Sequence, residues 1–163
     1  MGDKTNIIYN NQMDDFSSPN SECNSFSLPN FSINYIEPGK RPVSSMTPLI
    51  GLNDDKSVRL VCGSSGGTRI ITSTALTSAR NLFLNRDILQ SVDGPRLHQQ
   101  LHPDEVLYES DFDPEVGSIL ADKGHRLVNF GCGGSAVQAI ERLPDGRLHA
   151  VCDFRKGGVP NGF

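Results

Sequence analysis

Apolar residues in this chain occur in short runs that alternate with polar, glycine-rich segments. Runs of this length, rich in β-branched residues and bounded by Gly, Pro, Asn or Asp, are typical of strands. The predicted strands lie at residues 7–9, 46–52, 57–62, 106–109, 126–130, 136–142 and 148–153. The first is expected to be buried, and turn residues at 53–56 and 144–146 join two successive pairs of strands.

A different periodicity marks the helices. Apolar residues recur at helical spacing over residues 70–84, which predicts a helix that Thr68 or a loop glycine could cap. A second, short helix is expected at residues 87–92, before a Gly-Pro break, and a third at 114–123 with proline in its first turn. Strands and helices in this mixed order predict an α+β class.

The length and charge of the chain narrow the possibilities. With 163 residues the chain can build one core but not two comfortable domains, so a single domain over residues 1–163 is expected. Residues 17–32, rich in Ser, Asn and Pro, are expected to form an irregular surface loop within it. A net charge of −4 excludes the basic footprint of a nucleic-acid-binding protein. No apolar run approaches the roughly 20 residues of a bilayer span.

Cysteine and histidine give few signs of a metal site. The four cysteines, at positions 23, 62, 132 and 152, stand too far apart for a C-x-x-C motif. Cys62 and Cys152 each end an apolar run, so buried free thiols are expected, while a disulfide stays open. His98 and His102 would share a helical face, but without a third ligand the pattern favours a solvated pair over zinc. Asn30 begins a glycosylation sequon, whose use would depend on the secretory pathway.

The most informative chemistry lies at residues 63–68, where an apolar strand gives way to Gly-Ser-Ser-Gly-Gly-Thr and then to a predicted helix. Such a loop exposes successive backbone N–H groups at a helix start, which suits a developing negative charge. A phosphate-binding loop is the alternative. However, Arg69 follows Thr68 and no lysine stands in the motif position, which disfavours nucleotide binding.

Two further segments offer polar side chains to a small ligand. Asp14 and Asp15 follow an Asn-Asn-Gln sequence, which is typical of an Asx capping turn and could also receive an ammonium group. Ser44 and Ser45 follow a proline-fixed, extended lead-in, and would either begin a strand or hold a carboxylate. Together with the glycine loop, these segments predict a site for a small zwitterion that carries an acyl group.

Six segments together resemble the small subunit of gamma-glutamyltranspeptidase (glutathione hydrolase), a family of the N-terminal nucleophile hydrolase superfamily. The matching segments are residues 10–16, 38–46, 63–68, 94–98, 153–158 and 160–163. The resemblance covers essentially the whole chain in the right order. It implies part of a four-layer αββα sandwich, with residues 1–163 as one incomplete domain, the C-terminal portion of the small subunit.

The resemblance also implies which residues bind the donor substrate. Asp15 matches the carboxylate that binds the α-amino group of the γ-glutamyl donor, and Gln12 matches the polar residue that assists it. Ser44 and Ser45 match the pair that contacts the donor α-carboxylate and the nearby loop.

The catalytic part of the resemblance concerns two glycines. Gly66 and Gly67 match the oxyanion-hole glycines, whose backbone N–H groups face the tetrahedral oxygen. One cleft is expected to contain both Gly66 and the Asp15 carboxylate, within about 10 Å of each other, a span that an amino-acid donor can bridge. The resemblance implies no cofactor and no metal.

One departure from the family concerns the nucleophile. The family uses a threonine that autoproteolysis leaves at the N-terminus of the small subunit, in a Thr-x-His context well before the Asn-Asn-Gln motif. Thr5 has neither that spacing nor the histidine, so we do not expect it to be the nucleophile. The chain is therefore expected to be a C-terminal fragment that is inactive alone. The alternative is a non-catalytic fragment or a light-chain-like protein.

The resemblance implies a set of partners. The donors would be glutathione and other γ-glutamyl compounds, the acceptors amino acids, dipeptides or water, and the protein partner the large subunit of the same precursor. In the intact family the activity lies on the extracellular face of the plasma membrane or is secreted, although no targeting segment is recognised in this chain.

Overall fold

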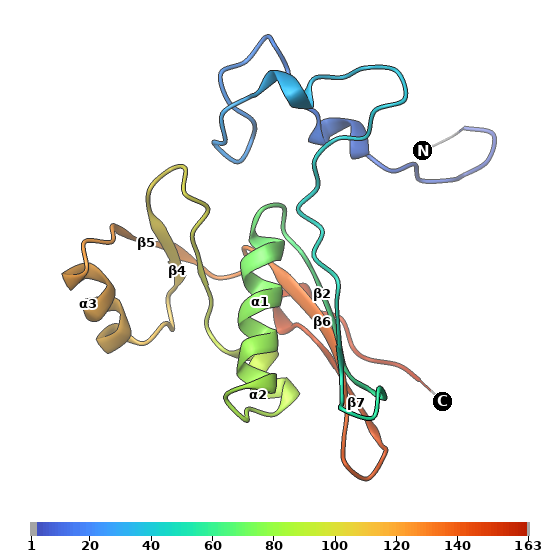
Figure 1. The fold of residues 1–163 in the computed structure, drawn as a ribbon, viewed down its shortest axis with the longest axis vertical. Coiled ribbons are helices and arrows are strands. Elements are labelled where there is room, and N and C mark those ends of the chain that lie inside the picture. The colour runs from blue at the N-terminus through green and yellow to red at the C-terminus, as the bar shows by residue number, and fades with distance from the viewer. Residues whose placement is uncertain (1–2, 163) are drawn as a thin grey trace. The chain divides into compact units, whose positions relative to one another are not determined.

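The computed structural model describes residues 3–162, so the Met-Gly start and the last residue of the 160–163 motif lie outside it. The chain divides into two compact units, Met1–Ser44 and Ser45–Phe163 (Figure 1). Each unit is described by itself. None of the helices within residues 3–162 has the length and apolar character that a membrane span requires.

The first unit is built from turns. Its regular elements are two 3₁₀ turns, η1 (Gln12–Asp15) and η2 (Ser32–Asn34). An isolated bridge joins Ser17 to Tyr35. The surface loop predicted at residues 17–32 is confirmed, because this segment is irregular and mostly exposed.

The prediction of a buried strand at residues 7–9 is wrong. The segment pairs with no strand of the described residues, and its apolar side chains are exposed, that of Ile8 by 83%. An apolar run forms a strand only where a neighbour satisfies its backbone N–H and C=O groups and covers one face. The sequence showed the run but not the absence of that neighbour.

The second unit contains a four-stranded antiparallel sheet of order β1-β2-β6-β7. The strands are β1 (Leu49–Leu52), β2 (Val58–Ser65), β6 (Ala136–Arg142) and β7 (Leu148–Cys152). The sequence prediction of all four strands, and of the tight turns in the β1-β2 and β6-β7 hairpins, is confirmed. Two boundaries differ by three residues. Residues 63–65, expected in the glycine loop, pair with β6 and so continue β2, and β1 begins at Leu49 and not at residue 46.

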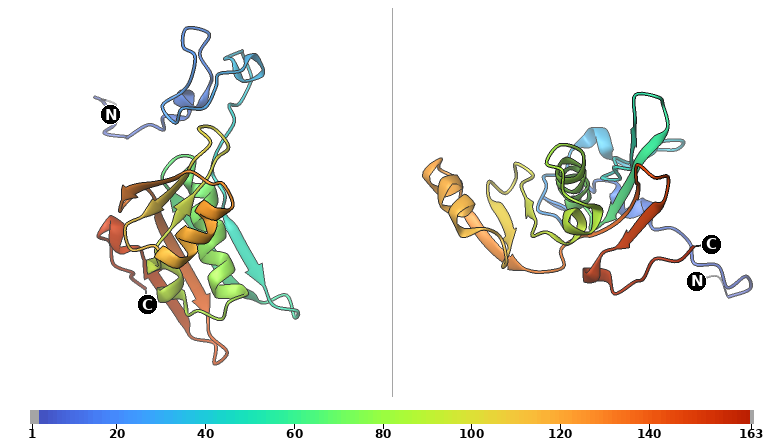
Figure 2. Two further views of the ribbon diagram at one scale, coloured as in Figure 1. Left: turned by 90° about the vertical axis from the view of Figure 1, so that its left-hand side faces the viewer. Right: turned by 90° about the horizontal axis from the view of Figure 1, so that it is seen from below.

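Two helices, α1 (Arg69–Leu82) and α2 (Ile88–Asp93), cover one face of this sheet (Figures 1 and 2). Both lie close to their predicted positions. An apolar core forms between α2 and the sheet. The buried residues of this core are Leu60, Cys62, Ile88, Val92, Val137, Ala139 and Val151.

Helix α1 buries a polar stripe instead of its apolar one. Its buried residues are Ser73, Thr74, Thr77, Ser78 and Asn81. The Ser73 hydroxyl donates to Ser64 Oγ in β2 at 2.8 Å. By contrast Ile71, part of the predicted apolar period, and Phe83, at the end of the helix, are 49% and 78% exposed. Ile71 and Phe83 therefore face away from the core of this unit, whereas Leu82 of the same helix packs against it.

A second, three-stranded sheet contacts α1 through its first strand. Its order is β3-β4-β5, with β3 at Leu97–His98, β4 at Val106–Glu109 and β5 at Leu127–Gly131. Strands β4 and β5 are parallel, and α3 (Pro114–Asp122), which packs against β5, connects them. The sequence predicted β4, α3 and β5, but β3 is too short to give a pattern. The mixture of sheets and helices confirms the α+β class.

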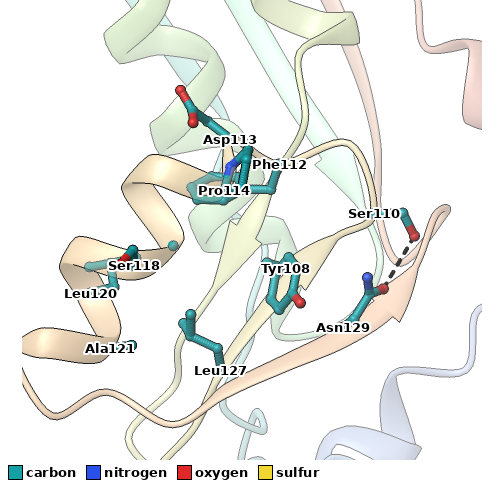
Figure 3. A pocket seen from close by; sticks show the side chains of 11 residues that line it. Tyr108, Ser110, Phe112, Asp113, Pro114, Ser118, Leu120, Ala121, Leu127 and Asn129 are labelled. Atoms are coloured by element: carbon teal, nitrogen blue, oxygen red, sulfur yellow. Dashed lines mark hydrogen bonds between the residues drawn. The ribbon is translucent and has the colours of Figure 1, made fainter.

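A pocket of about 390 Å³ opens between α3 and strands β4 and β5 (Figure 3). Tyr108, Phe112 and Leu127 contribute its apolar lining, and at one end the Ser110 hydroxyl donates to Asn129 Oδ1 at 3.2 Å. The pocket contains none of the residues that the sequence assigns to catalysis or donor binding.

The sheet face opposite α1 and α2 carries an apolar row across its strands. Ile50, Val61 and Ile140 are direct cross-strand neighbours in β1, β2 and β6. They are 66%, 42% and 43% exposed, although adjacent side chains of the same strands are buried on the helix side. A contiguous exposed row of this kind is typical of a surface that another part of a protein covers.

Candidate active-site elements

The glycine loop is a three-residue turn, residues 66–68, between β2 and α1. Gly66 has φ +135° and Gly67 has φ +61°, conformations that glycine adopts without steric cost. A Cβ on Gly66 would lie 2.7 Å from the Gly134 carbonyl oxygen and 2.8 Å from Ser135 Cα. Within residues 3–162 neither glycine N–H donates a backbone hydrogen bond. The turn therefore presents two unpaired N–H donors at the start of α1, as an oxyanion requires.

Thr68 ends the turn and was expected to cap α1. It occupies the cap position, but its hydroxyl makes no capping bond and donates instead to Gln100 Oε1 at 2.6 Å. Gln100 Oε1 also lies 2.8 Å from His98 Nε2, and Thr72 Oγ1 lies 2.8 Å from His98 Nδ1. Since an amide oxygen only accepts, His98 Nε2 carries a proton and donates to Gln100 Oε1. His98 Nδ1 lies beside the Thr72 hydroxyl, which also contacts the Arg69 carbonyl oxygen at 3.3 Å.

His98 is part of this buried chain, so the prediction of a solvated histidine pair is wrong for His98. It lies in β3 and is only 4% exposed, and desolvation by burial lowers the pKa of its imidazole. The suggestion that His98 and His102 share a helical face is wrong, because neither lies in a helix. Among residues 3–162, no group of three or more His, Cys, Asp or Glu side chains is placed to hold a metal ion.

A buried ionic network supports the other side of the glycine turn. Arg96 Nη1 donates to the Ser135 carbonyl oxygen at 2.9 Å and to Ser135 Oγ at 3.1 Å. Its Nη2 donates to Asp153 Oδ2, which also accepts from the Val137 N–H at 2.7 Å. Because Ser135 packs directly against Gly66, the Arg96–Asp153 ion pair restrains the segment that shapes the turn.

Two more charged residues extend this network. Arg155 contacts Asp153 Oδ1 at 3.1 Å and Glu109 Oε2 at 2.6 Å, and all of these side chains are at most 3% exposed. Burial alone would raise the pKa of Asp153, but the hydrogen bonds from the Val137 N–H and Arg96 outweigh it and hold that pKa below its ordinary value. In the sequence, residues 153–158 stood out only as a segment that resembles the family, and this role was missed because its partners are remote in the chain.

The donor-binding residues predicted near residue 15 lie in the first unit. Asn10 Oδ1 accepts from the Gln12 N–H at 3.1 Å, which confirms the Asx turn, and Gln12 and Asp15 are both exposed in η1. Their side chains are thus available to a ligand. The Asp15 carbonyl oxygen accepts from Asn34 Nδ2 at 2.9 Å.

Asn34 is a residue that the sequence did not single out. It is 4% exposed, and its Oδ1 accepts from the Val43 N–H at 3.0 Å. One carboxamide thus links η1 to the segment that ends at Ser44. An asparagine within the apolar run Phe-Ser-Ile-Asn-Tyr-Ile was the available signal, since a polar side chain buried in such a run needs hydrogen-bond partners.

The serine pair lies at the boundary of the two units, with Ser44 ending the first and Ser45 beginning the second. Thr47 Oγ1 donates to the Ser45 carbonyl oxygen at 3.0 Å. Gly66 belongs to the second unit and Asp15 to the first, so their expected meeting in one cleft stays a prediction.

The four cysteines are free. Cys62 is buried, as expected, and burial raises the pKa of its thiol. Cys152 is half-buried, and the other two are exposed.

Comparison with known proteins identifies the family. The family model described as Gamma-glutamyltranspeptidase matches residues 1–163. The chain belongs to the gamma-glutamyltranspeptidase family. It is similar to scoloptoxin SSD20 of Scolopendra dehaani, with 45% identity over 159 residues, 98% of this chain and 80% of that protein. Glutathione hydrolase 2 of Arabidopsis thaliana is 40% identical over 175 residues, which cover 98% of this chain and 30% of that protein.

Solved structures of the family have the same fold. The crystal structure of a Helicobacter pylori gamma-glutamyltranspeptidase mutant matches with a TM-score of 0.81 and 35% identity, over 94% of this chain and 83% of that one. The predicted N-terminal nucleophile hydrolase fold is therefore confirmed. In such an αββα sandwich, α1 and α2 provide one helical layer and the β1-β2-β6-β7 sheet one of the two central layers. This chain spans less than a third of the length of the Arabidopsis relative.

Proposed function

We propose that this chain is the donor-binding and oxyanion-binding portion of a gamma-glutamyltransferase or glutathione hydrolase small subunit. The observation that carries the proposal is the turn at Gly66 and Gly67, with two unpaired N–H groups at a helix start. In the family reaction a threonine hydroxyl attacks the γ-glutamyl carbonyl, and the carbonyl oxygen becomes an oxyanion. Preorganised N–H donors lower the barrier because they cost no reorganisation when that charge appears.

The other residues would hold the donor in place. Asp15 would bind the α-ammonium group with help from Gln12, and Ser44 and Ser45 would bind the α-carboxylate. Their exposure (Gln12, Asp15 and Ser44) or half-burial (Ser45) leaves these side chains accessible. The acyl group would then pass to water, an amino acid or a dipeptide, and none of these steps needs a cofactor.

We further propose that the apolar row, Ile50, Val61 and Ile140, packs against the second central sheet of the sandwich, which the large subunit would contribute. Its support is the exposure of these three apolar side chains on the face that α1 and α2 leave free. The threonine nucleophile would come from outside these 163 residues. An extracellular or secreted location follows from the family alone.

The test is a chimera in which this chain replaces the matching region of Arabidopsis glutathione hydrolase 2. The chimera should release p-nitroaniline from γ-glutamyl-p-nitroanilide. The isolated chain should give no turnover above background, with or without a separately expressed large subunit, and neither should its Thr5→Ala variant. Turnover by the isolated chain that disappears in Thr5→Ala would refute the assignment of the nucleophile. An inactive chimera that folds and matures would refute the proposed function.

A non-catalytic, light-chain-like protein is the second candidate. The observation that favours it is the similarity to scoloptoxin SSD20, of which this chain covers 80%. The discriminating observation is the transcript upstream of residue 1. A continuous frame that contains Thr-x-His favours the enzyme, and a stop codon favours the non-catalytic protein.

A further inference from the structure

Asn34 makes three side-chain hydrogen bonds at the centre of the first unit. Its Nδ2 donates to the Asp15 carbonyl oxygen at 2.9 Å and to Ser17 Oγ at 3.2 Å, and its Oδ1 accepts from the Val43 N–H at 3.0 Å. The η1 segment and the Asn34 segment are already joined by the bridge between Ser17 and Tyr35, and the Asn34 side chain adds the connection to Val43. At 4% exposure it is one of the best-buried residues of this unit.

The two ends of this link lie next to the residues proposed to bind opposite charges of one donor. Asp15 would hold the α-ammonium group, and Ser44, the neighbour of Val43, would hold the α-carboxylate. Both groups are attached to the same α-carbon of a γ-glutamyl donor, so the two receptors must keep a fixed separation. A displacement of the order of 1 Å in such a contact can cost about 10²-fold in rate.

Among its described residues, the first unit also has a backbone bridge between Ser17 and Tyr35, but this bridge does not reach the Val43 segment. The described part of the unit contains no sheet or α-helix, and its buried residues are the polar pair Ser17 and Asn34. An apolar core therefore cannot set the distance between η1 and the Val43 segment. Directional hydrogen bonds from a buried carboxamide can, because a broken one leaves a buried polar group unpaired.

We infer that Asn34 is a positioning residue that sets the spacing between the ammonium-binding and carboxylate-binding sides of the γ-glutamyl donor site. The inference rests on the function proposed above. Asparagine suits the position because one planar group donates at one end and accepts at the other. Leucine keeps its approximate size without either bond, and aspartate keeps only the acceptor.

The first arm of the test measures the link in the 163-residue chain, without any need for activity. In Asn34→Leu, amide hydrogen exchange at Val43 should accelerate at least about 10-fold relative to β6, because its acceptor is lost. In Asn34→Asp, the exchange rate of the Val43 amide should stay within about 3-fold of the wild-type rate, because the acceptor oxygen is kept. The resonance of the Asp15 carbonyl carbon should shift in both variants, because the hydrogen-bond donor to that carbonyl is lost.

Asn24→Ala is the matched control. Asn24 Oδ1 accepts from the N–H groups of Phe26 at 2.9 Å and Leu28 at 3.1 Å, so it orders the same unit without contacting either end of the link. Its removal should change only the local loop. If Asn24→Ala accelerated exchange at Val43 as much as Asn34→Leu does, the unit would be loosening as a whole, and the inference would be overturned.

The second arm measures kinetics in the assembled enzyme that contains this chain. Asn34→Leu and Asn34→Asp should raise KM for a γ-glutamyl donor about 10-fold or more, with kcat for the acyl acceptor step changed less than about 3-fold. Asn24→Ala should change neither constant. Unchanged KM in both Asn34 variants overturns the inference. If the wild-type enzyme has no γ-glutamyl activity, the proposed function fails, while the exchange arm separately decides whether the link exists.

Discussion

The first unit, Met1–Ser44, and the second, Ser45–Phe163, bury different kinds of side chain. Among the described residues, Ser17 and Asn34 are the buried positions of the first unit, and both are polar. The second unit buries an apolar cluster around Leu60 and Ile88 and, next to it, the network of Arg96, Asp153, Glu109 and Arg155.

This difference matters because the residues proposed for donor binding and those proposed for oxyanion binding lie in different units. The residues proposed to bind the donor, Gln12, Asp15 and Ser44, are in the unit whose order depends on individual hydrogen bonds. The oxyanion glycines are in the unit that has a core, between a paired strand and a helix. Directional hydrogen bonds set the spacing of the donor-binding groups, whereas the positions of the oxyanion donors depend on a packed strand and helix. The five predictions below test this contrast through the free energy of unfolding and, where stated, through enzyme kinetics.

The largest effect is expected at Asp153. Asp153→Asn leaves two buried arginines without their shared carboxylate, and breaking a buried ion pair typically costs about 3–5 kcal/mol. Urea unfolding of the second unit measures this loss. The control is Asp145→Asn, which breaks the ion pair with Arg147 at the surface, where the Asp145 side chain is 51% exposed and the Arg147 side chain 76%. It should cost less than about 1 kcal/mol, and similar losses in both variants would contradict the role of the network.

The lowered pKa of Asp153 also predicts how the free energy of unfolding depends on pH. Its pKa is lowered in the folded protein, so its stabilising contribution is complete above the unfolded-state pKa of about 3.9 and is lost as pH falls below that value. Wild-type unfolding free energy should therefore fall more steeply below about pH 4 than that of Asp153→Asn.

Gly66→Ala is expected to have the next largest effect. The new Cβ would meet the Gly134 carbonyl oxygen at 2.7 Å in a backbone conformation that disfavours alanine, and a strained position of this kind costs about 1–3 kcal/mol. In an active chimera, kcat should fall about 10²-fold, as for the loss of one oxyanion donor. Gly63→Ala is the matched control, since its Cβ would meet no atom within 4 Å. Wild-type kcat in Gly66→Ala would exclude this turn from catalysis.

A smaller effect is expected from His98. Burial lowers the pKa of the folded imidazole, so unfolding takes up a proton, and stability falls as pH drops below the unfolded-state value of about 6.5. Between pH 7.5 and 5, the free energy of unfolding of the wild type should fall by up to about 1 kcal/mol more than that of His98→Gln. Equal pH slopes in the two proteins would mean that His98 is solvated.

The smallest effect on stability is expected at Asp15. The side chain is exposed, so Asp15→Asn should change the unfolding free energy by less than about 0.5 kcal/mol. In the active chimera the same change should raise KM for the donor about 30-fold or more, because the ammonium group loses its charged partner. Asp14→Asn, the adjacent exposed carboxylate, should leave KM unchanged. A large loss of stability in Asp15→Asn would show that this carboxylate is structural.

The sequence by itself determined most of the local structure and the family. The strands of the β1-β2 and β6-β7 hairpins, the three α-helices and the glycine turn followed from residue periodicity and turn chemistry, which act over a few positions. Family motifs indicated Gly66, Gly67 and Asp15. The same local patterns failed at residues 7–9, where an apolar run has no partner strand, and in α1, where the hydroxyl side chains and not the apolar ones are buried.

Only the tertiary structure decided which polar residues support the candidate site. Asn34 reaches Asp15 across 19 positions, and Arg96 reaches Asp153 across 57. No periodicity in the sequence encodes such contacts, because they depend on how separate elements pack and not on the conformation of either segment. Burial then gives these bonds their energetic weight, since a polar group removed from water must find its partner within the protein.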